Sequence, residues 1–180
     1  MKRGVVFFVL LTALSLIGAA AQQNAAELTF SFTRQSGAAS NQFAVWIENS
    51  QGQFIKTLYA ARYTANGGWR RRATSIPLWV SRSGLSGMTN AQVNAITGAT
   101  PGTGNLTYTW DGTDSRGAAV PAGNYVIFLE GTLRWENQVL YRAEIRLGQG
   151  PAEAEVSVEY TGDPGQERAM IGGVAVRTLR

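Results

Sequence analysis

The stretch Val139-Leu140-Tyr141-Arg142-Ala143-Glu144-Ile145-Arg146-Leu147 decides the fold class. Its odd-numbered residues are apolar, whereas Arg142, Glu144 and Arg146 between them are charged. Successive side chains of a β-strand point to opposite faces of its sheet, so this alternation predicts a strand with one buried face and one wet face.

The same two-residue period recurs along most of the chain. Strands are predicted at residues 28–32, 43–47, 54–59, 106–110, 125–133, 139–147, 156–160 and 174–177. Asn49-Ser50-Gln51-Gly52 separates two of them and predicts a hairpin. We therefore expect an all-β protein, an antiparallel immunoglobulin-like β-sandwich with one long inserted loop or short helix.

The first 21 residues have the pattern of a cleavable export signal of the Sec type. Met1-Lys2-Arg3 is basic, Val5 to Ile17 is apolar, and Ala19-Ala20-Ala21 supplies small residues for cleavage. No Cys follows the apolar run, so a lipoprotein anchor is excluded. We expect a periplasmic, soluble mature chain in which residues 22–180 form one β-sandwich domain, with a retained N-terminal anchor as the alternative.

Composition excludes several kinds of chemistry. The chain has no Cys and no His, so disulfides, thiolate or imidazole metal sites and a Ser-His-Asp triad are ruled out. Removing the signal lowers Lys plus Arg from 16 to 14 and leaves Asp plus Glu at 12, so the net charge falls from +4 to +2. This charge gives little reason to expect a nucleic acid partner.

Other residues are assigned to structure. Trp46, Trp110 and Trp135 lie in strand-like segments and are expected to pack in the core or at a sheet edge. The carboxylates that a glycosidase-like mechanism would need are expected at the surface, so we expect no enzyme. These carboxylates are Glu48, Glu130, Glu136 and Glu144.

Residues 62–104 interrupt the strand pattern. The segment from Met88 to Ile96 is compatible with one short helix, and the remainder has no regular period. A loop of this length is usually functional or disordered, and Trp69 and Trp79 argue against disorder. We therefore place the functional surface in this loop.

The segment from Trp110 to Tyr125 contains Trp-Asp-Gly-Thr-Asp-Ser-Arg-Gly followed by Pro-Ala-Gly-Asn-Tyr. Asp side chains cap turns by accepting backbone N–H bonds, and Gly112 and Gly117 permit positive φ. The segment resembles the W-D-G-x-D signature of the immunoglobulin-like domain of flagellar hook-capping proteins, which implies a fold and no activity. A calcium loop at Asp111 and Asp114 is disfavoured because the ligand spacing is absent, so no metal site is expected.

The segment from Asn94 to Thr100, Asn-Ala-Ile-Thr-Gly-Ala-Thr, resembles the D-[GA]-x-[ST]-G-A-T sequence to which an exported flavin transferase attaches FMN. The resemblance implies a phosphoester at Thr100, with Thr97, Gly98 and Ala99 completing the cofactor-binding loop. Small residues there leave room for a phosphate. The chain departs from the pattern at Asn94, where the motif has Asp, and an ordinary polar turn is the alternative.

Trp69-Arg70-Arg71-Arg72 combines an indole ring with three guanidinium groups. Arginine recognises phosphate with a planar fork of donors and stacks on aromatic rings, so the four residues are candidates for a phosphate or partner contact. The alternative is a solvated loop, since charge runs usually face water.

Several segments together resemble an uncharacterised family of predicted periplasmic bacterial proteins, a domain-of-unknown-function family. They include Val45-Trp46-Ile47-Glu48-Asn49, Gly67-Gly68-Trp69-Arg70, Thr97-Gly98-Ala99-Thr100-Pro101 and Leu129 to Trp135. The resemblance implies association with a flavin transferase and a membrane flavin reductase-like protein. It favours a covalent FMN carrier in extracytoplasmic electron transfer. The second hypothesis is a cofactor-free binding or assembly module that uses the Arg-Trp loop.

Overall fold

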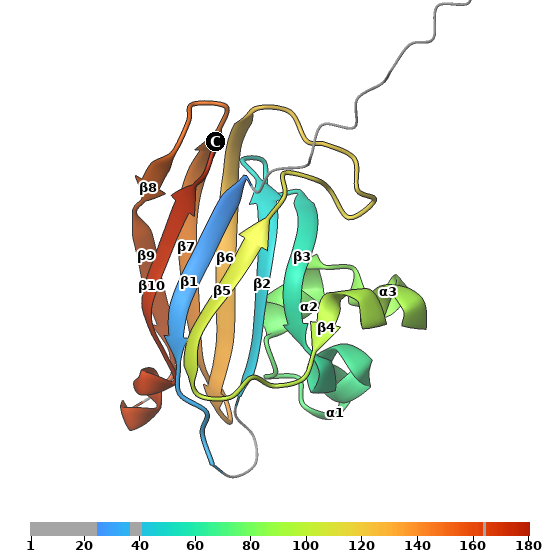
Figure 1. Cartoon of the computed structure of the whole chain (residues 1–180). Coiled ribbons are helices and arrows are strands. Elements are labelled where there is room, and N and C mark those ends of the chain that lie inside the picture. Colours follow the sequence, from blue (N-terminus) through green and yellow to red (C-terminus); the bar gives the residue numbers. More distant parts are fainter. Residues whose placement is uncertain (1–24, 37–40, 164) are drawn as a thin grey trace, which may run out of the picture.

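The computed structural model describes residues 25–36, 41–163 and 165–180, which form two β-sheets packed face to face (Figure 1). The predicted signal peptide lies outside these ranges. One sheet has the order β5 (Gly104–Trp110), β1 (Ala26–Phe32), β10 (Ile171–Thr178) and β8 (Ala152–Ala154). The other has the order β4 (Thr97–Gly98), β3 (Phe54–Ala61), β2 (Gln42–Asn49), β6 (Gly123–Arg134), β7 (Asn137–Leu147) and β9 (Val156–Thr161).

The pairing of the strands confirms the predicted antiparallel sandwich. Every pair is antiparallel except β3 and β4, which run parallel over two residues. Between the sheets lies the main core, which includes Leu28, Phe30, Phe43 and Leu129. β7 alternates as predicted, with its apolar residues in this core and its charged residues exposed.

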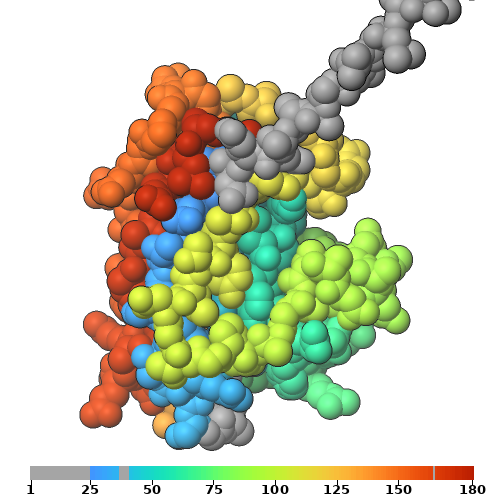
Figure 2. Space-filling view, in the orientation of Figure 1, coloured from blue at the N-terminus to red at the C-terminus, as the bar shows by residue number. Residues whose placement is uncertain are grey.

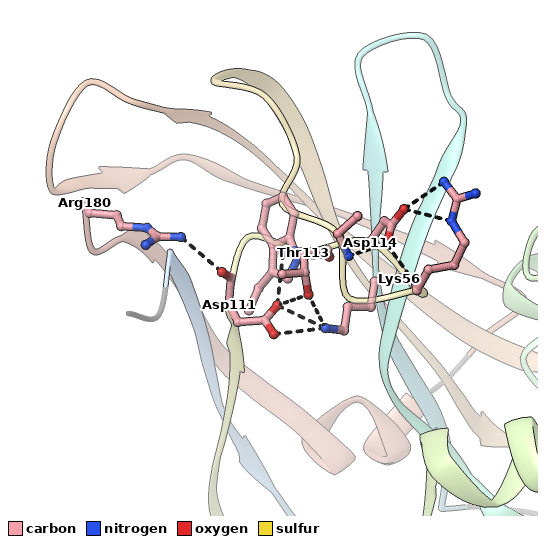
Figure 3. A network of polar contacts seen from close by, with 8 residues as sticks. Lys56, Asp111, Thr113, Asp114 and Arg180 are labelled. Atoms are coloured by element: carbon pink, nitrogen blue, oxygen red, sulfur yellow. Dashed lines mark hydrogen bonds and ion pairs between the residues drawn. The ribbon is translucent and has the colours of Figure 1, made fainter. Parts of the chain in front are cut away.

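The loop after β5 is a network of Asp-capped turns (Figure 3). Asp111 accepts hydrogen bonds from the backbone N–H of Thr113 at 3.0 Å and from the Lys56 ammonium at 3.0 and 3.1 Å. Asp114 accepts from the backbone N–H groups of Arg116 and Ala118 at 2.8 and 2.9 Å. The predicted capping is confirmed, and the cation that Asp111 binds is the ammonium of Lys56.

The hydrogen bonds around Asp111 also set its protonation. Partial burial raises the pKa of this carboxyl, but bonds from Thr113 and Lys56 outweigh it and bring the pKa below its ordinary value. Asp111 is therefore ionised at neutral pH, and its ion pair with Lys56 joins the loop to β3.

The insert between β3 and β5 is more helical than the sequence predicted. It contains the π-helical turn η1 (Thr64–Gly68), α1 (Trp69–Arg71), α2 (Pro77–Arg82), the 3-10 turn η2 (Leu85–Gly87) and α3 (Asn90–Ile96). The predicted short helix is α3, which begins with a capping box in which Thr89 and Gln92 bond each other's backbone N–H. η3 (Gly165–Met170) lies outside the insert, before β10.

A second core attaches the insert to the outer face of the six-stranded sheet. Trp79 and Ile76 of the insert are fully buried against Trp46 and Phe128 of the sheet, whose rings stack with centroids 4.9 Å apart. Trp79, which argued against disorder in this segment, is a core side chain that holds the insert to the sheet. In Figure 2 the insert projects as a lobe from one side of the sandwich.

The three tryptophans that were expected to pack in the core or at a sheet edge differ in burial. Trp46 and Trp110 are buried as predicted. Trp135 is not, because it lies in the turn between β6 and β7 with φ 51° and is 58% exposed. Trp135 lies beyond both the predicted strand, which ended at Leu133, and β6, which ends at Arg134.

Two of the carboxylates expected at the surface are buried beneath the insert. Glu130 accepts hydrogen bonds from the backbone N–H groups of Leu78 and Trp79, at 3.0 and 2.8 Å, and so caps the start of α2. Glu48 accepts from the Trp46 indole at 2.7 Å and pairs with the guanidinium of Arg82. The surface prediction failed because a sheet face that looked solvated is covered by residues 62–104.

We expect Glu130→Gln to flatten the pH dependence of stability. Burial raises the pKa of Glu130 to about 7, against the opposing effect of two backbone N–H donors. Its stabilising contribution is therefore complete below the unfolded pKa of 4.5 and is lost as pH rises towards 7, a change of about 3 kcal/mol. Urea unfolding of both proteins between pH 4 and 8 measures this change in unfolding free energy.

Glu144→Gln, on the wet face of β7, is the matched control and should keep the wild-type pH profile. A Glu130→Gln profile parallel to that of the wild type would contradict the assignment.

Candidate functional site

Thr100 is positioned by the parallel pairing of β4 with β3. Ala60 pairs with Thr97 and Ala61 pairs with Gly98. The two strands run in the same direction and end at this pair, at Ala61 and Gly98. The two residues after β4, Ala99 and Thr100, therefore emerge beside Arg62 and Tyr63, which follow β3.

Tyr59 fixes the loop that carries Thr100. Its hydroxyl donates a hydrogen bond to the carbonyl oxygen of Ala99 at 3.2 Å, and a Cβ atom on Gly98 would lie only 2.7 Å from its ring. Burial raises the pKa of Tyr59 to about 12, although the nearby Arg62 lowers it, so the phenol remains a donor near neutral pH. Gly98 is thus required for close packing against Tyr59.

A pocket of about 700 Å³ opens at this point. Thr100, which is partly buried, lines it together with three arginines, Arg62, Arg70 and Arg71. The other lining residues are Tyr63, Asn66, Gly67, Gly68 and Ala99. Three guanidinium groups and a hydroxyl, with no carboxylate among the lining residues, form an electropositive pocket suited to an anionic group.

The π-helical turn η1 returns the chain to the pocket. Gly67 has φ 93°, a conformation that side chains disfavour, and a Cβ atom on Gly68 would collide with the backbone oxygen of Tyr63. These glycines allow the chain to fold back on itself within one turn. As a result, Arg70 and Arg71 line the same pocket as Arg62.

The remaining residues predicted for the site lie around the pocket. Thr97 is in β4, and its hydroxyl is buried with no hydrogen-bond partner in the described part of the chain. Trp69 lines a neighbouring pocket, and the Arg70 guanidinium lies 4.9 Å from its ring centroid. Arg72 donates to the backbone oxygen of Trp135 at 2.7 Å and so ties α1 to the β6–β7 turn.

Sequence reasoning missed Arg62 and Tyr59. Arg62 is separated from Thr100 by most of the insert, and only the parallel register of β3 and β4 brings the two together. Tyr59 lay in a predicted strand and had no polar neighbours in sequence that would single it out. The glycine of a Thr-Gly-Ala-Thr loop was the available signal, because a glycine often marks close approach of another group.

We expect Tyr59→Phe to loosen the Thr100 loop while leaving the sandwich folded. The change removes one hydrogen bond, which should cost about 1 kcal/mol of unfolding free energy. Hydrogen exchange measured by mass spectrometry should show faster exchange at residues 97–104.

Tyr125→Phe is a matched control, since the Tyr125 hydroxyl also bonds a backbone oxygen, that of Pro121 at 2.7 Å. Tyr125→Phe should speed hydrogen exchange in the loop around Pro121 and leave exchange at residues 97–104 unchanged. Equal exchange of that segment in wild type and Tyr59→Phe would contradict the anchoring role.

Comparison with known proteins identifies one family. No helix among the described residues is long and apolar enough to cross a membrane. No curated protein and no solved structure matches the chain. A family described as "Predicted periplasmic protein (DUF2271)" matches residues 23–165. Because this match covers most of the chain and confirms the resemblance to a periplasmic family of unknown function, the protein belongs to the DUF2271 family of predicted periplasmic proteins.

Proposed function

We propose that this protein carries FMN covalently on Thr100 and transfers electrons outside the cytoplasm. Its partners would be an exported flavin transferase, a membrane flavin reductase-like protein and an exported electron acceptor. The observation that supports the proposal is that Thr100 and three arginines line one pocket. The sequence motif that suggested Thr100 says nothing about those arginines, so their convergence on it is independent support.

The charges of the pocket fit a phosphodiester. A flavin phosphate esterified to Thr100 would keep one negative charge, and Arg62, Arg70 and Arg71 supply the opposite charge around it. The three arginines are exposed, so each guanidinium–phosphate pair would contribute about 0–1 kcal/mol. The pocket also lies within the size range of small-molecule sites, about 300–1,000 Å³.

Attachment requires the chain to supply only an accessible nucleophile. The Thr100 hydroxyl oxygen would attack the flavin-side phosphorus of a flavin dinucleotide and form a new P–O bond. The pyrophosphate P–O bond would break, the nucleoside monophosphate would leave with the bonding electrons, and the hydroxyl proton would pass to a base of the transferase. In this role the protein is the substrate of an enzyme and not itself a catalyst.

The chain's own residues then position and screen the cofactor. The chain has no Cys and no His, so its side chains supply charge, packing and hydrogen bonds. A bound flavin supplies the redox chemistry by accepting two electrons and two protons. Tyr59 holds the attachment loop against β3, and the arginines neutralise the phosphate.

We expect Thr100→Ala to abolish modification. Co-expression of the wild-type chain with an exported flavin transferase should give a fluorescent band on a denaturing gel and a mass increase of one FMN. The Ala variant should show neither, because the acceptor oxygen is missing. A wild-type chain that stays unmodified under these conditions contradicts the proposal.

Two further variants test whether modification is specific to Thr100 and to the motif around it. Thr107→Ala removes an exposed hydroxyl on β5 and should leave modification unchanged. Asn94→Asp places the motif's acidic residue at its missing position and should raise the modified fraction. Modification that survives in Thr100→Ala would show that another hydroxyl is the acceptor.

We also expect the arginines to stabilise the modified form. Attachment of FMN to the wild type should raise the thermal midpoint, because the new phosphate pairs with guanidinium groups that otherwise face water. Arg70→Gln combined with Arg71→Gln should abolish that rise, as measured by differential scanning fluorimetry of modified and unmodified protein. Arg146→Gln, on the exposed face of β7, should retain the full rise. If FMN raises the thermal midpoint of the double variant as much as that of the wild type, Arg70 and Arg71 do not contact the phosphate.

A further inference from the structure

We propose that a second pocket, lined by Trp69, Met88 and Asn94, binds the planar ring of the flavin whose phosphate lies among the arginines. The inference rests on the proposed function and adds to it a binding site for the isoalloxazine ring, the redox-active part of the cofactor. It follows from the position of this pocket, its lining and its exposed amides.

The two pockets are contiguous. Asn66, Gly67 and Arg70 line both, so the π-helical turn η1 forms their common wall. The second pocket has a volume of about 490 Å³ and lies within the insert, between α1, η2 and α3. α3 leads through β4 directly to Thr100. A ligand fixed at Thr100 would therefore have a neighbouring cavity on the same side of the sheet.

The lining of the second pocket combines an indole and a thioether group with polar side chains. Leu85 and Val93 are almost fully buried beneath it, while Trp69 and Met88 are partly exposed at its walls. Indole and thioether groups pack favourably against aromatic rings. None of the lining residues is acidic, and Arg70 is the only basic one. This composition contrasts with the three arginines around Thr100.

Most polar groups of the second pocket are amides, and the Ser86 hydroxyl lies among them. Asn66, Asn90 and Asn94 line the pocket, and all three are exposed and so accessible to a ligand. An amide side chain offers both donors and an acceptor. The pyrimidine edge of an isoalloxazine ring likewise alternates carbonyl oxygens with an N–H.

The ring site has two measurable consequences. A flavin packed beside Trp69 should be quenched by the indole and shielded from solvent. An acidic group in place of an asparagine amide should make reduction harder, because it disfavours the added negative charge of the reduced ring. Neither consequence follows if the attached flavin projects into solvent from Thr100.

The first experiment uses flavinylated full-length protein, with the modification verified by mass. Flavin emission should be several-fold weaker than that of free FMN and poorly quenched by iodide. Trp69→Leu should restore emission several-fold at equal modification, whereas Trp135→Leu, at an exposed turn, should not. Wild-type emission and iodide quenching equal to those of free FMN would overturn the ring site while leaving the covalent carrier intact.

The second experiment avoids any loss of packing. Asn90→Asp is isosteric and lies at an exposed position at the start of α3. It should lower the midpoint potential of the attached flavin, measured by spectroelectrochemical titration. Asn124→Asp, exposed on β6, should leave the potential unchanged. An unchanged potential in Asn90→Asp would count against the ring site, whereas a chain that accepts no flavin would contradict the proposed function itself.

Discussion

The two-residue parallel pairing of β4 with β3 is the constraint on which the candidate site depends. Parallel strands need a long connection between them, and the insert supplies it. The pairing places Thr100 beside Arg62, and Tyr59 secures it by packing under Gly98 and bonding the Ala99 carbonyl. Without that register the Thr100 hydroxyl and Arg62 would lie on unconnected parts of the surface.

The insert in turn depends on burial of the outer face of the six-stranded sheet. Seven of the eight residues of β2 are buried, because the main core covers one face and the insert covers the other. The start of α2 lies over the sheet, where its backbone N–H groups need acceptors, and Glu130 provides them. Glu48 has a similar function through Trp46 and Arg82. Both buried carboxylates therefore attach the insert to the sheet.

The fold signature and the candidate site lie at opposite ends of β5. The Asp111 network follows the last residue of β5, whereas the Thr100 loop precedes its first residue (Figures 1 and 3). Changes at Asp111 or Lys56 therefore act on the sandwich through the turn that they cap. Changes at Arg70 act on the pocket. Tyr59 belongs to both regions, because its ring also packs in the main core against Phe43.

The sequence by itself determined the antiparallel sandwich and eight of the ten strands in the described residues, because alternation of apolar residues is a local signal, but it did not predict β4 or β8. It also indicated a short helix in the segment that forms α3. It also identified Thr100, Arg70 and Arg71, which line one pocket in the structure. Only the tertiary structure decided that Glu130 and Trp79 are buried, that Trp135 is exposed and that Arg62 meets Thr100. These outcomes depend on which segment covers which sheet face and on strand register, and both are set by contacts between residues far apart in the chain.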